Sequence, residues 1–215
     1  MEFNEKHLHY HAMLDALDQK ECPVCFLIRT SIDSYFKTLL YENINDLGFK
    51  KKFREQDGFC NQHSYNFLKY NDRLAVTLTH KDILLQKVTQ YKKNNKIKPA
   101  KKENCMICEL EEITEKRYLS VIIEYADDKE LKTKFSKSSG LCIPHFEKIK
   151  KKIGSRSKWL LDFHKMTYEK ILNQAVKYLE ASNISLGENR PKLSPEDYDI
   201  HNRLVKTICG YEGMK

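Results

Sequence analysis

Apolar residues recur at helical spacing along most of this chain. After Cys25 they fall at Ile28, Ile32, Phe36 and Leu39, separated by steps of three and four residues. That spacing places them on one face of an amphipathic α-helix, with polar residues on the opposite face. The turn residues of the following stretch, "NINDLGF", predict that this helix ends or bends there.

The same kind of pattern predicts further helices. A shorter one begins near Cys60 and continues to about Tyr70, and a longer one carries apolar residues on one face at Leu74, Leu78, Leu84, Val88 and Tyr91. Another helix is expected over about residues 5–19. A last one is expected after Ser194, which suits an N-cap because Pro195 follows it at a first-turn position. No stretch is typical of a strand of a parallel sheet.

The helical pattern occurs twice, which indicates an internal duplication. Aligning Cys22 with Cys105 brings apolar and polar positions into register over more than thirty residues, with one residue fewer in the second turn. The matched pairs include Cys25/Cys108, Tyr35/Tyr118, Leu39/Ile122, Asp46/Asp128, Phe53/Phe135, Gly58/Gly140, Cys60/Cys142 and His63/His145. The predicted fold is therefore all-α, with two tandem similar three-helix repeats and extra N- and C-terminal helices. Residues 1–98 would hold the first repeat and 99–215 the second, as two domains or as one pseudo-symmetric domain.

Each repeat contains two pairs of metal-binding side chains, a Cys-x-x-Cys and a Cys-x-x-His. Together they supply three sulfurs and one imidazole nitrogen, a common tetrahedral ligand set for zinc. The first repeat offers Cys22, Cys25, Cys60 and His63, and the second offers Cys105, Cys108, Cys142 and His145. The spacing predicts two zinc sites, with each repeat supplying one set. It also allows a pair from one repeat to combine with a pair from the other.

Local sequence places these pairs at helix N-termini. Pro23 suits a first helical position, so Cys22 is expected at the cap of its helix and Cys25 in the first turn. Gly58 and Gly140 precede the Cys-x-x-His pairs and suit tight loops. The free N–H groups and the dipole of a helix N-terminus favour thiolate over thiol.

Other chemistries fit the pattern less well. An iron–sulfur cluster is the main alternative to zinc, because it uses the same thiolates. A thioredoxin-type redox pair requires a βαβ context, which is missing here. Four protein ligands leave a zinc ion no open position for water, and no phosphate loop or Ser/His/Asp order is visible, so an enzyme is disfavoured. The matched His80 and His164 are expected to be packed or solvated helix residues, with support of a ligand as the alternative, and Cys209 is expected to be buried.

Composition adds information about partners and compartment. The formal net charge is +8, and lysines concentrate in "KVTQYKKNNKIKPAKK" (87–102) and, with arginine, in "KIKKKIGSRSK" (148–158). These segments are solvated surface or sites for an acidic protein or nucleic acid. No apolar run approaches the roughly 20 residues that cross a bilayer, and the start lacks a signal-peptide hydrophobic core. We therefore expect no membrane insertion and a cytoplasmic location. Cysteines stay reduced there, which favours metal ligands, reactive thiols or core residues over disulfides.

The motifs also carry a resemblance. "YHAMLDALDQKECPVC", "YFKTLLYENINDLGFKKKFREQDGFCNQH" and "GLCIPHF" resemble an uncharacterised family of bacterial and archaeal proteins, in which Cys-Pro-x-Cys and Gly-Phe-Cys-x-x-His elements are duplicated. The likeness extends to about residue 180, and it departs at Met106, which stands where the first repeat has Pro23. The resemblance implies metal binding and no particular activity.

These observations favour a non-enzymatic interaction module stabilised by zinc, whose lysine-rich surface meets an acidic partner. An iron–sulfur redox or sensor protein and a basic nucleic-acid-binding protein are the alternatives.

Overall fold

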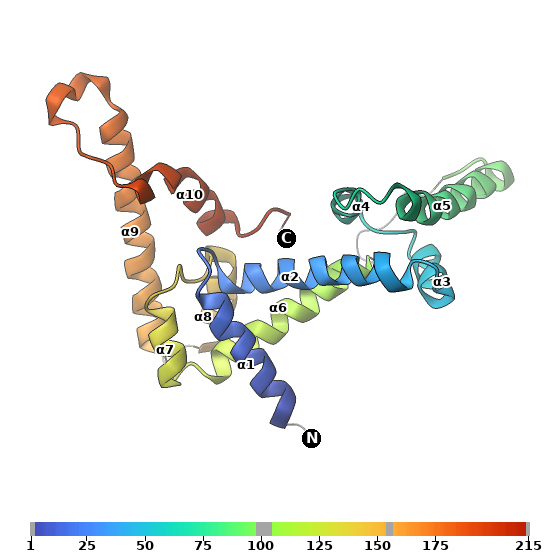
Figure 1. Ribbon diagram of the computed structural model, residues 1–215, viewed down its shortest axis with the longest axis horizontal. Helices are drawn as coiled ribbons and strands as arrows, with labels where there is room; N and C mark the ends of the chain where they lie inside the picture. The colour runs from blue at the N-terminus through green and yellow to red at the C-terminus, as the bar shows by residue number, and fades with distance from the viewer. Residues whose placement is uncertain (1–2, 98–104, 154–156, 214–215) are drawn as a thin grey trace. The chain divides into compact units, whose positions relative to one another are not determined.

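The structure is a computed structural model that describes residues 3–97, 105–153 and 157–213. All regular secondary structure in these residues is helical, which confirms the predicted all-α class (Figure 1). None of the described helices has the length and apolar character needed to cross a membrane.

Two series of helices follow each other in the same order, as the predicted repeats require. In the first series the helices are α2 (Pro23–Thr38), α3 (Leu47–Glu55), α4 (Asn61–Leu68) and α5 (Arg73–Asn94), with a π-helical turn at Leu39–Asn43. In the second they are α6 (Met106–Glu124), α7 (Lys129–Phe135), α8 (Ile143–Ile153) and α9 (Lys158–Ser182). Helix α1 (Phe3–Leu17) precedes them, and the 3₁₀ segments Ile184–Asn189 and Pro195–Asp199 lead to α10 (Ile200–Cys209).

The short helices α3 and α7 lie between the predicted long and short helices of each repeat, where the sequence pattern predicted no helix. Each begins at an aspartate N-cap: the Asp46 carboxylate accepts a hydrogen bond from the Phe49 N–H at 2.6 Å, and Asp128 accepts one from Leu131 at 2.9 Å. Each is anchored by a buried phenylalanine, Phe53 in α3 and the matched Phe135 in α7. Each repeat therefore contains one more short helix than the periodicity alone predicted.

The chain forms two compact units that are not its sequential halves. Unit 1 comprises Met1–Leu27 and Glu115–Lys215, and unit 2 comprises Ile28–Thr114. The boundaries fall inside α2 and α6, so each of these helices contributes its first part to one unit and its remainder to the other. These units follow contacts in space, whereas the expected division at residues 1–98 and 99–215 follows the repeats along the chain and stays a prediction.

Unit 1 is built around α7, α8 and α9, with the terminal helices packed on them. Helix α1 contacts α7, where the Tyr10 hydroxyl donates a hydrogen bond to Asp128 at 2.6 Å. Helix α10 contacts both α8 and α9, and its Ile200 is buried. Burial of such apolar side chains is the main source of stability for this arrangement.

Unit 2 has a core of aromatic side chains. Phe36 of α2 lies 5.4 Å from Phe59 and 5.3 Å from Phe67 between ring centroids, and Phe53 of α3 lies 4.9 Å from Phe59. Most of these pairs are edge-to-face, the geometry that aromatic quadrupoles favour. The cluster therefore fixes the end of α2, α3 and α4 against each other, beside the loop that leads to Cys60.

Candidate metal centres

The eight predicted ligands gather into two clusters, one in each unit. Within each cluster all four ligand atoms lie within 4.8 Å of one another. Site 1, in unit 1, consists of Cys22, Cys25, Cys142 and His145, and site 2, in unit 2, consists of Cys60, His63, Cys105 and Cys108. The structure thus brings all eight together but combines them across the repeats. The grouping expected within each repeat is corrected in favour of the crossed one.

Helix length explains why the pairs cross. Phe36, near the end of α2, packs on Phe59, the residue before Cys60. Cys25 lies in the first turn of the same helix, about 16 Å earlier at 1.5 Å per residue. The Cys60/His63 pair is therefore out of reach of Cys25, because ligands of one ion lie within a few ångströms of each other.

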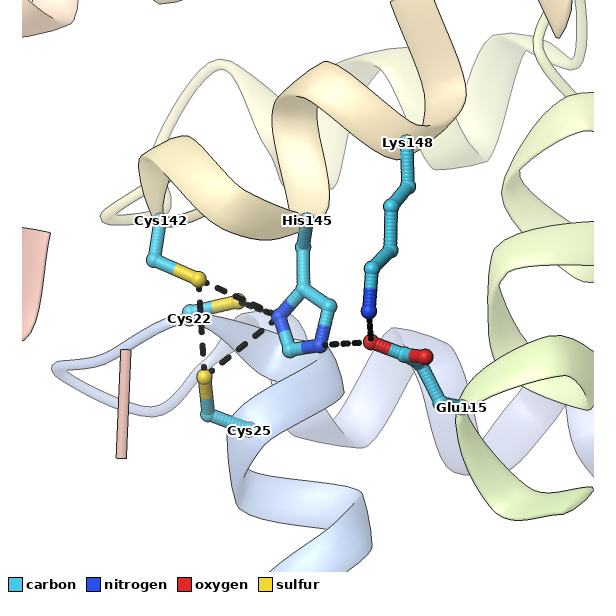
Figure 2. A network of polar contacts seen from close by, with 6 residues as sticks. All are labelled: Cys22, Cys25, Glu115, Cys142, His145 and Lys148. Atoms are coloured by element: carbon cyan, nitrogen blue, oxygen red, sulfur yellow. Dashed lines mark hydrogen bonds and ion pairs between the residues drawn. The ribbon is translucent and has the colours of Figure 1, made fainter. Parts of the chain in front are cut away.

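Site 1 presents its four ligand atoms to a common centre (Figure 2). Nδ1 of His145 lies 3.1 Å from the sulfur of Cys142, 3.4 Å from that of Cys22 and 3.5 Å from that of Cys25. The sulfurs of Cys25 and Cys142 are 3.6 Å apart. All four residues are buried.

Site 2 has the same arrangement. Nδ1 of His63 lies 3.2 Å from the sulfur of Cys60 and 3.5 Å from the sulfurs of both Cys105 and Cys108. The sulfurs of Cys60 and Cys108 are 3.7 Å apart. Three of these residues are buried, whereas Cys108 is half-buried.

These distances fit tetrahedral coordination of a single ion. Zinc bonds of about 2.3 Å to sulfur and about 2.0–2.1 Å to nitrogen imply tetrahedral edges of about 3.8 Å between sulfurs and about 3.5 Å between sulfur and nitrogen. The measured edges are 3.6 and 3.7 Å between sulfurs and 3.1 to 3.5 Å between sulfur and nitrogen. Each cluster can therefore hold one metal ion with little movement of its side chains.

All four pairs of ligands lie at helix N-termini, as predicted. In each pair the backbone carbonyl of the leading cysteine accepts the first hydrogen bond of the helix, at 2.9 to 3.1 Å; these cysteines are Cys22, Cys60, Cys105 and Cys142. The second member of each pair then falls in the first turn of α2, α4, α6 or α8. Helix α6 begins at Met106 without the proline found in α2, so the substitution does not displace the helix start. The helix dipoles place partial positive charge beside the thiolates.

Glycines shape the loops that lead to the Cys-x-x-His pairs. Gly58 and Gly140 have φ angles of 85° and 71°, in the left-handed region that other residues rarely adopt. A Cβ on Gly140 would also lie 3.1 Å from the Phe163 ring. These two positions were predicted as tight loops, and the prediction is confirmed.

A carboxylate lies behind each imidazole, and both carboxylates belong to α6. Nε2 of His63 lies 3.2 Å from Oε1 of Glu111. Nε2 of His145 lies 3.0 Å from Oε1 of Glu115 as an ion pair, and Lys148 contacts the same oxygen at 2.5 Å (Figure 2). Metal-bound histidines commonly donate their second ring N–H to such a group, which leaves the other nitrogen free for the ion.

Sequence reasoning missed these glutamates. The residues matched to Glu111 and Glu115 in the first repeat are Ile28 and Ile32, so the duplication gives no signal for them. Only the packing of α4 and α8 against α6 shows that these two glutamates lie beside the histidines.

Without metal, the imidazole of each site holds its proton more tightly than a free histidine does. Burial lowers the pKa of the His63 imidazole, but Cys105 and Glu111 outweigh it and raise the pKa to about 10. The pKa of His145 likewise rises to about 11, because Cys142, Cys22 and Glu115 outweigh burial. Burial raises the pKa of Cys105, but His63 and backbone N–H groups lower it to about 6. Metal binding at either site therefore has to displace protons.

His164 supports the loop before Cys142. Its Nε2 accepts a hydrogen bond from the Leu141 N–H at 2.9 Å, and its Nδ1 donates one to the Leu160 carbonyl at 2.7 Å. The ring is buried and stacks on Phe146 at 4.5 Å, so it is both packed and connected to the site. The matched His80 is half-buried, with Nδ1 3.0 Å from the Val76 carbonyl.

Cys209 belongs to neither cluster. It is exposed, so the expectation that it is a small buried side chain was wrong.

Comparison with known proteins is consistent with the internal repeat and identifies no activity. The model of a family of unknown function (DUF6062) matches residues 5–104 and again 77–182. The two overlapping matches are consistent with a repeat, and together they span most of the chain. The chain matches no curated protein and no solved structure. It therefore belongs to the DUF6062 family of unknown function.

Proposed function

We propose that this protein is a non-enzymatic helical interaction module that binds one structural zinc ion at each of its two sites. The observation that carries the proposal is the pair of buried clusters, each with three sulfurs and one imidazole nitrogen within 4.8 Å of one another. A carboxylate behind each imidazole supports it.

The spacing of the ligand atoms favours zinc over an iron–sulfur cluster. A cluster contains two or more irons bridged by sulfides, and its protein ligands are distributed over those irons. Such ligands stand farther apart than the ligands of one ion. Edges of 3.6 and 3.7 Å between sulfurs suit a single ion, and three thiolates with one imidazole are a common zinc set.

A structural role follows from the number of ligands. Four protein atoms complete the tetrahedron of a zinc ion and leave no position for a substrate or an activated water. Structural zinc contributes about 10–16 kcal/mol in small peptides, which is comparable with the stability of about 5–15 kcal/mol of a whole domain. Zinc would therefore hold the start of α2 to α8 in unit 1, and α4 to the start of α6 in unit 2.

A reducing compartment suits this role. Six thiols packed at 3 to 4 Å from their neighbours would form disulfides in an oxidising environment, and we infer that the protein functions in the cytoplasm. The net charge of +8 favours an acidic partner for such a module.

Elemental analysis of the full-length protein, purified without added metal, tests the proposal. We expect two zinc ions per chain and no visible absorption. Replacement of zinc by cobalt should produce the absorption bands of tetrahedral thiolate coordination. The control variant Cys209→Ser should keep both zinc ions, because Cys209 lies in neither site. A brown preparation with iron and acid-labile sulfide would refute the proposal in favour of an iron–sulfur protein.

A further inference from the structure

Helix α5 of unit 2, green in Figure 1, carries a row of exposed apolar side chains. The exposed fractions are 69% for Leu74, 61% for Leu85 and 39% for Val88, and Leu78 in the same row is half-buried. The opposite side of the helix faces the core of unit 2, where Ala75 and Thr79 are buried and α3 and α4 make contact. The apolar row therefore points away from its own unit.

The row has the spacing of a helix-packing seam. Leu74, Leu78, Leu85 and Val88 fall on one line of alternating four- and three-residue steps. Two lysines complete that line, and we call the whole set the α5 seam: Leu74, Leu78, Lys81, Leu85, Val88 and Lys92. This is the heptad spacing at which one helix packs along another. The seam extends over about 27 Å, and the exposed Leu84 widens it on one side. An apolar surface of this kind on a soluble protein commonly marks an interaction site.

Charge indicates the chemistry of the partner. The Lys81 side chain is 65% exposed, and Lys92 and the neighbouring Lys93 are exposed with no ion-pair partner among the described residues. Asp82, 3.5 Å from Lys81, also lies 3.6 Å from Arg54. When a partner covers a lysine in the seam, burying its charge costs free energy unless the partner supplies an anion beside it.

We propose that the α5 seam is the docking surface for an acidic amphipathic helix of a partner protein. Apolar residues of that helix would cover Leu74, Leu78, Leu85 and Val88, and its carboxylates would meet Lys81 and Lys92. The inference rests on the proposed function as an interaction module and names the surface and the partner.

Two other occupants fit less well. A second copy of α5 would bring its own lysines to the seam, because Asp82 is the only acidic residue of this helix. Nucleic acid would use the lysines, but phosphate contacts give no role to a row of exposed leucines.

Titration of zinc-loaded full-length protein with labelled synthetic helices tests the inference. The probe is a helical peptide with leucine at its heptad positions and glutamate at the positions that face Lys81 and Lys92, and the control peptide carries lysine at those positions. We expect saturable binding of the acidic peptide and at least about tenfold weaker binding of the basic one. Leu85→Ser with Val88→Ser should weaken binding about tenfold or more, whereas Leu172→Ser, at the exposed position of α9 matched to Val88, should leave it unchanged.

Charge reversal provides the sharpest result. Lys81→Glu with Lys92→Glu should transfer the preference from the acidic to the basic peptide, with helix content and zinc content unchanged. Absence of peptide binding by a chain that holds two zinc ions would overturn the docking proposal and leave the proposed function intact. Self-association abolished by Leu85→Ser would overturn it in favour of a second copy. Binding of a DNA duplex that depends on Lys92 and not on Leu85 would overturn it in favour of nucleic acid. If the metal-free protein binds the peptide, the docking proposal stands and the structural role proposed for zinc is contradicted.

Discussion

At the scale of single residues, the two metal centres differ in how their histidines are supported. Glu111 and Glu115 lie one turn apart on α6 and face His63 and His145 respectively. The matched residues of α2, Ile28 and Ile32, have no charge to offer. The two repeats therefore match in their candidate ligands, but only the second repeat supplies the glutamates that lie beside the histidines.

Glu115→Gln should weaken zinc binding at site 1, because it keeps the shape of the side chain and removes the negative charge beside His145. We expect about 10- to 100-fold lower affinity, measured by competition with a coloured chelator. Site 2 serves as an internal reference, and Glu112→Gln, at an exposed position of the same helix, is the matched control. Identical zinc release from the variant and the native protein would contradict a positioning role for Glu115.

The buried position of His164 predicts that the stability of unit 1 depends on pH. Burial lowers its pKa to about 4 from the ordinary 6.5. Between pH 6.5 and pH 4 the unfolded chain takes up a proton at His164 that the folded chain does not. The stability that neutral, buried His164 contributes is therefore present above pH 6.5 and is lost as the pH falls toward 4. At pH 5.5 the expected loss of stability is on the order of 1 kcal/mol.

His164→Gln should reduce the decline in stability between pH 7.5 and 5.5, measured by urea denaturation of zinc-loaded protein. The half-buried His80 is the matched position in the first repeat, so His80→Gln is the comparison. Parallel pH profiles for the native protein and His164→Gln would show that His164 does not titrate as described.

At the scale of the elements, helix starts organise the molecule. Every pair of ligands occupies the N-terminus of a helix, and these starts could be predicted from the cysteine spacing, Pro23 and the glycines. Helices α3 and α7 could not be predicted, because 9 and 7 residues are too few for a clear periodicity and their capping aspartates lie among turn residues. Their anchoring phenylalanines were visible as matched positions, but burial was needed to show that a helix forms there.

The two capping aspartates should differ in their contributions to stability. Asp46→Ala removes one N-cap, which costs about 1 kcal/mol. Asp128→Ala removes the matched cap and also the acceptor of the Tyr10 hydroxyl, which joins α1 to α7, and so should cost about 1 kcal/mol more. Urea denaturation of both zinc-loaded variants measures the difference. Tyr10→Phe should reproduce the additional loss, and equal costs for the two aspartates would contradict the role of the Tyr10 contact.

At the scale of the whole molecule, each unit draws on both repeats. Site 1 combines the Cys-x-x-Cys of the first repeat with the Cys-x-x-His of the second, and site 2 does the reverse. A single repeat therefore contains two half-sites that belong to different clusters. We infer that neither repeat completes a metal site by itself.

Zinc content of paired variants distinguishes crossed from uncrossed sites. Cys22→Ser with Cys142→Ser affects site 1 alone, and we expect one zinc ion per chain to remain. Cys22→Ser with Cys60→Ser affects both sites, and we expect both ions to be lost or weakly held. Native mass spectrometry measures the number of ions per chain. Ligand sets confined to one repeat would give the opposite result, with one ion retained in the second variant.

The sequence by itself determined the helical class, the eight candidate ligands and their placement at helix starts, because periodicity, capping and ligand spacing are local properties. Only the tertiary structure decided which pairs share a site, because α2 separates the two pairs of the first repeat by several turns that the aromatic core of unit 2 holds in place. It also decided that Glu111 and Glu115 lie beside His63 and His145 and that the apolar row of α5 faces outward. These features depend on which helices meet, and no short stretch of sequence contains that information.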